Sequence, residues 1–580
     1  MILTVAVLGA AAPAANASGG ARIFHVSPQI LSNVPPERQF RTISEAAHIV
    51  AAGDTVRIYD GLYRESVTID HSGTRERPIT FEAAPNAHVV VTGADRLLDW
   101  TKEGAEAENI FSTRWPHEFI TAEPTRSYPA GDYHLLIGRA EQVHVDGMPL
   151  RQVLAQQQLA RGTFFVDPVT KRLSVWADNN ANLIGRPDWS PQVDASTRSV
   201  LWNCTGAFVH LRGVRFRFAA NRAQQAATQF AGAGDVVEDC TFERTNSCGA
   251  VFLAPDQVVR RCTFQRNGQI GFVAVRAHRL RFSDCTVRNN NTKNFDQNWE
   301  AGGNKIVLSR DVVIERSRFL DNRGPGIWFD IGNENCTVRN CLIAGNEAAG
   351  LFYEISFRLS AHDNVVTGNG FLAAAGAWGA AAGIALSSSA DCVVERNLLV
   401  GNREGFNFRE QGRTTARIDA AAGAPEEPIW NHDDVLRRNI IAYNRDAQTW
   451  GWFDVSDERH WPVALRENLP GATPLRPPGV PELSLPKLRL TLRENVYAFA
   501  QGQGCFRWGV PWQQHEFYDG ADALKQAQRR LHLEQGSTIA PLTFANWRSL
   551  DFRLPASSSR KTRDAYPRGK VPGVKLGFSL

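Results

Sequence analysis

The sequence predicts an all-β solenoid of stacked coils, and three repeated features support that prediction. The three shortest steps between a recurring set of asparagines are 23, 24 and 23 residues, a period typical of repeats that bury their apolar faces only by stacking. Each of these asparagines lies five residues after a Cys, Ser or Asn, and a glycine followed by a strand-like run recurs with them, as in residues 326–330 (GIWFD) and 350–354 (GLFYE). The asparagines are Asn267, Asn290, Asn322, Asn346, Asn369, Asn402 and Asn444.

Composition and charge narrow the possible partners. The chain has 580 residues with a formal net charge of +4, from 64 basic and 60 acidic side chains, and no basic block. Nothing in this pattern favours a nucleic-acid partner. Residues 1–17 are apolar, rich in alanine and end in a small-x-small site, which predicts a signal peptide and a secreted or periplasmic protein. No later segment approaches the roughly 20 apolar residues of a membrane span, so we expect no membrane insertion.

The N-terminal part divides into two predicted domains. Residues 18–99 are expected to form a cap and the first coils, with a short helix that begins near Thr42 and a glycine, Gly53, after its end. Residues 100–200 lose the repeat. Their alternating runs at 142–147, 162–167 and 172–176 predict an inserted antiparallel β domain, similar to a small sandwich.

The remaining chain is predicted to form the main stack, residues 201–500, and a C-terminal cap and tail, residues 501–580, with a helix at 521–533. Two long loops are expected at 412–433 and 457–485. The nine cysteines are odd in number. Cys240, Cys262, Cys285 and Cys341 share the register of later asparagines, which favours free, buried thiols over disulfides.

Two acidic residues occupy the same register in neighbouring coils. Side chains alternate along a strand, so Asp330 and Glu354 are expected to point outward next to each other. Extending that register gives an outward column of Arg276, Ser309, Asp330, Glu354, Ser387, Arg409 and Asp454. A flanking column contains Val307, Trp328, Phe352, Ala385, Asn407 and Trp452.

The predicted spacing of the two carboxylates suits one kind of chemistry. Adjacent strands lie about 4.8 Å apart, close to the roughly 5 to 5.5 Å between the carboxyl groups of retaining glycosidases and short of the separation an inverting enzyme needs. Like charges on neighbouring strands destabilise a sheet, so a purely structural stack should avoid this arrangement. Mutual repulsion would separate a proton donor from an ionised nucleophile.

Other residues near the pair are candidate substrate ligands. The loop before the Asp330 coil contains two glycines, which allow a tight turn that would bring Glu300, Asn304 and Lys305 to the same face. Arg409 and Asp454 are expected on the opposite side of the pair. The aromatic residues Trp328, Phe352 and Trp452 could offer flat apolar faces to sugar rings.

The chain resembles known families at these residues. From about residue 40 to 98, and again from about 200 to 500, it is similar to secreted right-handed parallel β-helix proteins of the pectate-lyase-like class. The runs ending at Asp330 and Glu354 resemble β-helix glycoside hydrolases that include the β-xylosidases of family 120, and the inserted β domain fits that group. The resemblance implies a right-handed parallel β-helix, with Asp330 as nucleophile and Glu354 as acid/base.

Other interpretations of the same residues remain open. Asp330 and Glu354 could pair with Arg323, Arg358 or Lys305 on a solvated face, or Ca²⁺ could bind among Glu300, Asn304 and the two acids, since all are oxygen donors. Apart from that possible Ca²⁺, no cofactor is expected. A polysaccharide lyase or uronate epimerase could use Lys or Arg as base, and a non-catalytic solenoid could bind glycans. The substrate in each case is a polysaccharide or oligosaccharide.

Overall fold

The structure, a computed structural model, describes residues 20–103, 110–119, 136–176, 192–297, 299–372, 381–409, 413–421, 423–452, 488–510 and 514–579. The chain divides into two compact units. The first contains Met1–Phe252, Phe264–Phe272 and Thr292–Asp296, and the second Leu253–Thr263, Val273–Asn291 and Gln297–Leu580. Strands β25 (Thr263–Gln265) and β26 (Ile270–Val275) contain residues of both units. The predicted signal peptide, Asp454 and the 457–485 loop lie outside the described residues.

The first unit contains three sets of parallel strands. In pairing order, the first set is β2 (Gln39–Phe40), β1 (Ile23–Val26), β3 (Thr55–Ile58), β6 (Ile79–Ala83), β18 (Val209–Arg212) and β21 (Val236–Glu238). The second set is β5 (Val67–Ile69), β17 (Trp202–Cys204), β20 (Ala226–Phe230) and β23 (Cys248–Phe252). The third set is β4 (Gly61–Tyr63), β7 (Val89–Thr92), β19 (Val214–Arg217) and β22 (Thr241–Glu243). Helix α1 (Ile43–Ala47) begins with a capping box, in which Thr42 accepts a hydrogen bond from the Glu45 amide. The helix is present as predicted and ends earlier than expected.

The insertion in this unit is a two-sheet domain. One sheet has the order β13 (Arg151–Val153), β14 (Thr163–Asp167), β15 (Arg172–Trp176), β10 (Ile110–Arg114) and β9 (Thr101–Lys102), and the other β12 (Met148–Pro149), β11 (Val143–Val145), β16 (Val193–Ser196) and β8 (Ala94–Leu97). Both sheets contribute to one buried cluster that includes Val143, Val175 and Val193, as in a sandwich. The pairing is antiparallel except between β13 and β14.

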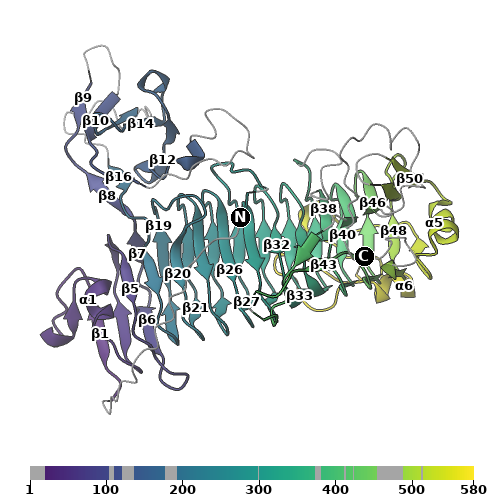
Figure 1. Cartoon of the computed structure of the whole chain (residues 1–580), viewed down its shortest axis with the longest axis horizontal. Coiled ribbons are helices and arrows are strands. Elements are labelled where there is room, and N and C mark those ends of the chain that lie inside the picture. The colour runs from purple at the N-terminus through teal and green to yellow at the C-terminus, as the bar shows by residue number, and fades with distance from the viewer. Residues whose placement is uncertain are drawn as a thin grey trace. The chain divides into compact units, whose positions relative to one another are not determined.

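The second unit is built from three parallel sheets whose strands stack coil upon coil (Figure 1). Sheet 1 contains β24 (Val258–Arg260), β27 (Arg281–Ser283), β30 (Val313–Glu315), β33 (Glu334–Arg339), β36 (Phe357–His362), β39 (Val393–Glu395), β44 (Val435–Arg437) and β47 (Thr491–Arg493). Sheet 2 contains β29 (Gly302–Val307), β32 (Ile327–Asp330), β35 (Leu351–Glu354), β38 (Ala382–Ser387), β41 (Glu404–Arg409), β46 (Ala447–Trp452), β49 (Phe506–Val510) and the antiparallel β50 (Gln514–Tyr518). Sheet 3 contains β28 (Thr286–Arg288), β31 (Arg318–Leu320), β34 (Leu342–Ala344), β37 (Val365–Thr367), β40 (Leu398–Val400), β45 (Ile440–Ala442), β48 (Val496–Ala498) and β51 (Thr538–Ile539). The predicted parallel β-helix is confirmed.

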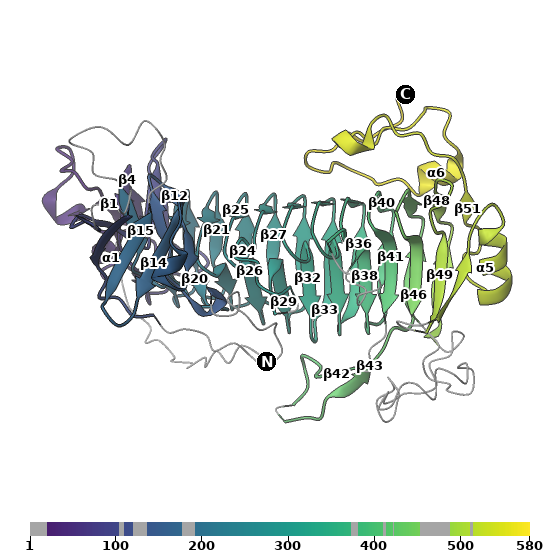
Figure 2. The same ribbon diagram turned by 90° about the horizontal axis from the view of Figure 1, so that it is seen from above.

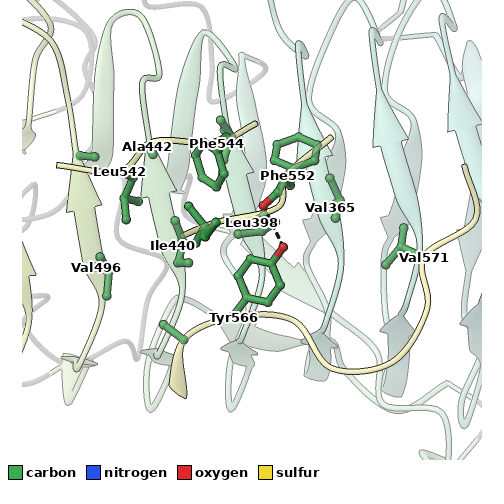
Figure 3. Close-up of a cluster of buried hydrophobic side chains, with 14 of the residues drawn as sticks. Val365, Leu398, Ile440, Ala442, Val496, Leu542, Phe544, Phe552, Tyr566 and Val571 are labelled. Carbon is green, nitrogen blue, oxygen red and sulfur yellow. Dashed lines mark hydrogen bonds between the residues drawn. The ribbon is translucent and has the colours of Figure 1, made fainter. Parts of the chain in front are cut away.

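The C-terminal tail covers an apolar stripe on the outside of sheet 3. After α5 (Ala523–Leu531), the chain returns along the sheet and includes α6 (Arg560–Asp564) (Figure 2). Its residues Phe544, Phe552 and Tyr566 pack against Leu398 and Ile440 (Figure 3). This burial explains why strands β40, β45 and β48 of sheet 3 are apolar on both faces. The described helices are short, and none could span a bilayer.

The repeated asparagines from Asn290 to Asn444 form a continuous internal ladder in the second unit. From Asn322 onward, each side-chain carbonyl accepts hydrogen bonds from the backbone and side-chain amides of the preceding asparagine, as in the Asn346–Asn369 pair at 3.0 and 2.9 Å. The repeated glycines pack against the side chains of these asparagines. A Cβ atom on Gly350 would lie 3.0 Å from the Asn369 amide nitrogen, and one on Gly326 only 2.7 Å from that of Asn346. The asparagine and glycine repeats therefore have one structural cause.

Truncation of the ladder should destabilise the protein strongly. Besides its two accepted bonds, the Asn369 amide donates to the Ile343 and Thr367 carbonyls and to Asn402. Because Asn369→Ala leaves several buried groups unpaired, we expect the free energy of unfolding to fall by about 3 kcal/mol or more. Denaturant unfolding measures the effect by comparing this variant with Asn203→Ala, because Asn203 on β17 has a half-buried side chain. Equal stability of the two variants would contradict a ladder that supports the stack.

All nine cysteines lie in the described ranges, and each is buried and free. The prediction of structural thiols is confirmed. The residues five positions before the asparagines form a second ladder, as in the bond from the Cys341 amide to Asn364 Oδ1. In this ladder the Cys285 sulfur accepts a hydrogen bond from the Cys262 amide at 3.3 Å, and the Cys285 amide donates to Ser317 Oγ at 3.1 Å. A thiol therefore takes the place that asparagine and serine hold in other coils.

Candidate active site

The two acids are direct neighbours on sheet 2. Strands β32 and β35 pair in parallel with Asp330 opposite Glu354 and Trp328 opposite Phe352. The alternate residues Phe329 and Tyr353 are fully buried in the coil interior, so both acids point to the outer face. Each is about 5% exposed, and their register continues through Ser387 to Arg409. The step of 24 residues from Asp330 to Glu354 is one coil without an insertion.

Lys305 is the central cation of this face. Its Nζ lies 2.8 Å from Asp330 Oδ2 and 3.1 Å from Glu300 Oε1, and 4.3 Å from the centre of the Trp328 ring. Burial would lower the pKa of Lys305, but the charges of Asp330 and Glu300 outweigh it and raise the pKa above its usual value. The lysine is therefore a stable cation that neutralises Asp330.

Removal of this cation should damage stability. Lys305→Met leaves the buried Asp330 without its counter-ion, which typically costs about 3–5 kcal/mol. Thermal unfolding measures the loss, with Lys525→Met as the control because Lys525 is exposed on α5. Equal stability of the two variants would contradict the assigned role of Lys305.

Aromatic and small apolar side chains lie beside the acids. Trp328 and Phe352 stack with ring centroids 5.8 Å apart and planes at 27°. Both belong to a buried cluster with Ala349, Ala382 and Ala385. The next residue in this column is Asn407, opposite Ala385. Trp328 and Phe352 therefore lie beside the acids, and Arg409 lies in the register of the acids themselves.

Several residues predicted for this face lie elsewhere. Pairing of Ile306 with Phe329 places Lys305, rather than Val307, beside Trp328. Ser309 belongs to an internal turn ladder, because its hydroxyl accepts from the Ala277 amide and its amide donates to Asn333. Asn304 shares the interior face of Ile306 and is 1% exposed, so it does not join Lys305.

The column also differs from the prediction at its two ends. Arg276 lies in a turn with a φ of 52°, not in the outward register. Trp450, rather than Trp452, stands opposite Asn407. Trp452 is one of the terminal residues of β46, where it pairs with Gly509 of β49. The predicted aromatic neighbour is thus displaced by two residues along its strand.

The structure shows which of the basic residues proposed as partners contact the two acids. Arg323 pairs with Glu347, and Arg358 with Glu334, so neither neutralises the candidate acids. Lys305 does pair with Asp330. Among the described residues, three metal-ligating groups converge at Asp391, His432 and Asp433, away from the acids. The Lys305 ammonium lies between Glu300 and Asp330, two of the residues among which the sequence also allows Ca²⁺ to bind.

Sequence analysis missed a third carboxyl group on this face. Glu404 pairs in register with Ala382, a member of the Trp328 cluster, and accepts a hydrogen bond of 2.8 Å from Asn407 Nδ2. Burial raises its pKa to about 7. The available signal was the residue before the repeated glycine, which is alanine at 349 and 382 but glutamate at 404.

The raised pKa of Glu404 predicts a measurable pH dependence of stability. The folded protein releases this proton near pH 7, whereas the unfolded chain releases it near its ordinary value of 4.5. Between these values the folded state binds more protons, so stability falls as pH rises, by at most about 3 kcal/mol. Glu404→Gln should lack this pH dependence. In urea unfolding, its stability relative to wild type should therefore increase as the pH rises from about 5 to about 8. A constant difference between the two proteins would contradict the assigned burial.

The expected loop at 412–433 contains a hairpin, β42 (Arg413–Thr415) and β43 (Glu427–Ile429). Arg417 binds Glu334 and lies 4.1 Å from the centre of the Phe357 ring. A Cβ atom on Gly332, two residues after Asp330, would lie 3.1 Å from the Ala416 carbonyl oxygen. The hairpin therefore packs over the turn that follows Asp330.

Comparison with known sequences gives a match to the stacked coils. The family model described as "Right handed beta helix region" matches residues 209–307 and 229–399 of this chain. The uncharacterized protein YwoF of Bacillus subtilis (strain 168) is 40% identical over 81 residues. That stretch is 14% of this chain and 17% of YwoF, so the likeness is local.

Comparison with solved structures extends the match to most of the chain. The structure of XylC in complex with xylose has a TM-score of 0.59 at 16% identity, covering 85% of this chain and 86% of that one. A glycoside hydrolase structure gives a TM-score of 0.40 at 12% identity, covering 85% and 97% of the two chains, a score too low for further conclusions. The sheet topology, the sequence match and the likeness to XylC identify this chain as a right-handed parallel β-helix protein.

Proposed function

We propose that the protein is an exported glycoside hydrolase that cleaves a polysaccharide or oligosaccharide with retention of anomeric configuration. The observation that carries this proposal is the direct pairing of Asp330 with Glu354 on one face, with Lys305 bound to Asp330. Neighbouring strands lie about 4.8 Å apart, which suits the roughly 5 to 5.5 Å carboxyl separation of retaining enzymes.

The contacts support different roles for the two acids. Asp330, paired with Lys305, would attack the anomeric carbon and form a glycosyl ester while Glu354 protonates the departing oxygen. Glu354 would then take a proton from the water that hydrolyses the ester. Trp328 and Phe352 would contact the apolar faces of sugar rings. Because XylC binds xylose, we propose xylosides as the first substrates to test.

The lyase or epimerase alternative is supported less well. That chemistry requires a base that abstracts a proton beside the substrate carboxylate, and a basic lysine is most effective when its pKa is lowered towards the working pH. The pKa of Lys305 is instead raised by its acidic neighbours. Lys305 is therefore suited to charge neutralisation rather than to proton abstraction.

Product analysis tests the proposal directly. Purified protein is incubated with nitrophenyl glycosides, xylo-oligosaccharides and uronate-containing polysaccharides, and the first-formed product is followed by proton NMR. We expect a new reducing sugar that initially has the anomeric configuration of the substrate. An ultraviolet-absorbing unsaturated end would indicate a lyase, an inverted first product would exclude the assigned nucleophile, and binding without turnover would favour a non-catalytic solenoid.

A further inference from the structure

A second polar group lies on the face of the acids, beyond Phe352. In register along sheet 2, Phe352 is followed by Ala385 on β38 and Asn407 on β41. Two strand spacings separate Phe352 from Asn407, about 10 Å. Of the described residues, Ala385 and the neighbouring Ala382 lie between them with their methyl groups, and both are fully buried.

The Asn407 side chain has a fixed orientation and an unused acceptor. Its Nδ2 donates to Glu404 Oε2 at 2.8 Å, which directs Oδ1 away from that carboxyl group. Oδ1 is buried and has no hydrogen-bond partner in the part of the chain that the structure describes. Buried polar atoms are rarely left in this state, because an unpaired acceptor loses its hydration without compensation.

A second buried atom in the same column also lacks a partner among the described residues. The indole Nε1 of Trp328 is a donor with no acceptor there, and Trp328 precedes Phe352 in the register that leads to Asn407. One donor and one acceptor thus lie on either side of a short apolar stretch. A ligand with hydroxyl groups can satisfy both atoms, since a hydroxyl both donates and accepts.

We propose that Asn407, oriented by Glu404, binds a hydroxyl of the sugar unit released in the reaction, so that the preferred substrate is at least a disaccharide lying across β32 to β41. The inference rests on the proposed function. Glu354, the assigned proton donor, lies one strand closer to Asn407 than Asp330 does. The leaving unit would therefore extend towards Ala385 and Asn407, and the other unit would occupy the side of Lys305 and Trp328.

The test compares two substrates that share the sugar on the Lys305 side. One is a xylo-oligosaccharide, whose leaving unit carries hydroxyls, and the other is a nitrophenyl xyloside, whose leaving group carries none. Asn407→Ala should lower kcat/KM for the oligosaccharide by about 10- to 100-fold and change that for the nitrophenyl xyloside less than about twofold. Asn203→Ala is the matched control, and thermal unfolding checks the fold of each variant.

A second variant protects the test against misfolding. Glu404→Met keeps the length of the side chain but offers no oxygen to accept a hydrogen bond from Asn407 Nδ2, so a smaller loss confined to the oligosaccharide is expected. Equal losses on both substrates, or no loss, would overturn this inference while leaving the proposed function intact. A wild-type protein that hydrolyses neither substrate would overturn both.

Discussion

Replacement of Asp330 by glycine is expected to lower kcat/KM for a nitrophenyl glycoside by about 10⁴-fold or more, because loss of a covalent nucleophile removes the pathway itself. Asp330 lies 2.8 Å from Lys305 Nζ and opposite Glu354. Steady-state kinetics with the purified variant measure the loss.

Addition of azide distinguishes a nucleophile from a structural residue. In Asp330→Gly a small anion can enter the vacated space and attack the anomeric carbon directly. The expected product is a glycosyl azide of inverted configuration, together with recovered turnover. Glu347→Gln, which removes a carboxylate paired with Arg323 on the neighbouring loop, should retain wild-type activity. Full activity of Asp330→Gly without azide would exclude the assigned nucleophile.

Replacement of Glu354 by alanine should produce a loss that depends on the leaving group. General acid catalysis contributes about 10²- to 10⁴-fold, and this contribution matters most for a sugar leaving group, which departs poorly without a proton. A dinitrophenyl glycoside departs unaided, so its first step should change little. Kinetics on a series of aryl glycosides would show a steeper dependence on leaving-group acidity than in wild type.

The azide product separates the roles of the two acids. In Glu354→Ala the Asp330 ester still forms, and azide replaces water in the second step. The expected glycosyl azide therefore has retained configuration, opposite to that from Asp330→Gly. An inverted azide from Glu354→Ala would show that the roles of Asp330 and Glu354 are exchanged.

The pairing of the two acids could be predicted from sequence because no insertion separates their coils. The step from Asn322 to Asn346 is 24 residues, and the same step leads from Asp330 to Glu354. A stacked repeat of constant length keeps every residue in register with its equivalent in the next coil.

The neighbouring columns could not be predicted so accurately. Longer steps of 32 and 42 residues precede β29 and β46 respectively, and the errors at Val307 and Trp452 are both shifts of two residues. Such a shift preserves the alternation of inward and outward side chains. The apolar pattern therefore fits both registers equally, and only the observed pairing selects Lys305 and Trp450.

The sequence by itself determined the repeat, the asparagine and glycine ladders, the free thiols and the face that Asp330 and Glu354 share, because these features follow from short motifs that recur in each coil. Only the tertiary structure decided that Lys305 neutralises Asp330, that Asn304 turns inward, and that Glu404 orients Asn407. Those contacts join residues across insertions and between strands, where distance along the chain does not fix separation in space.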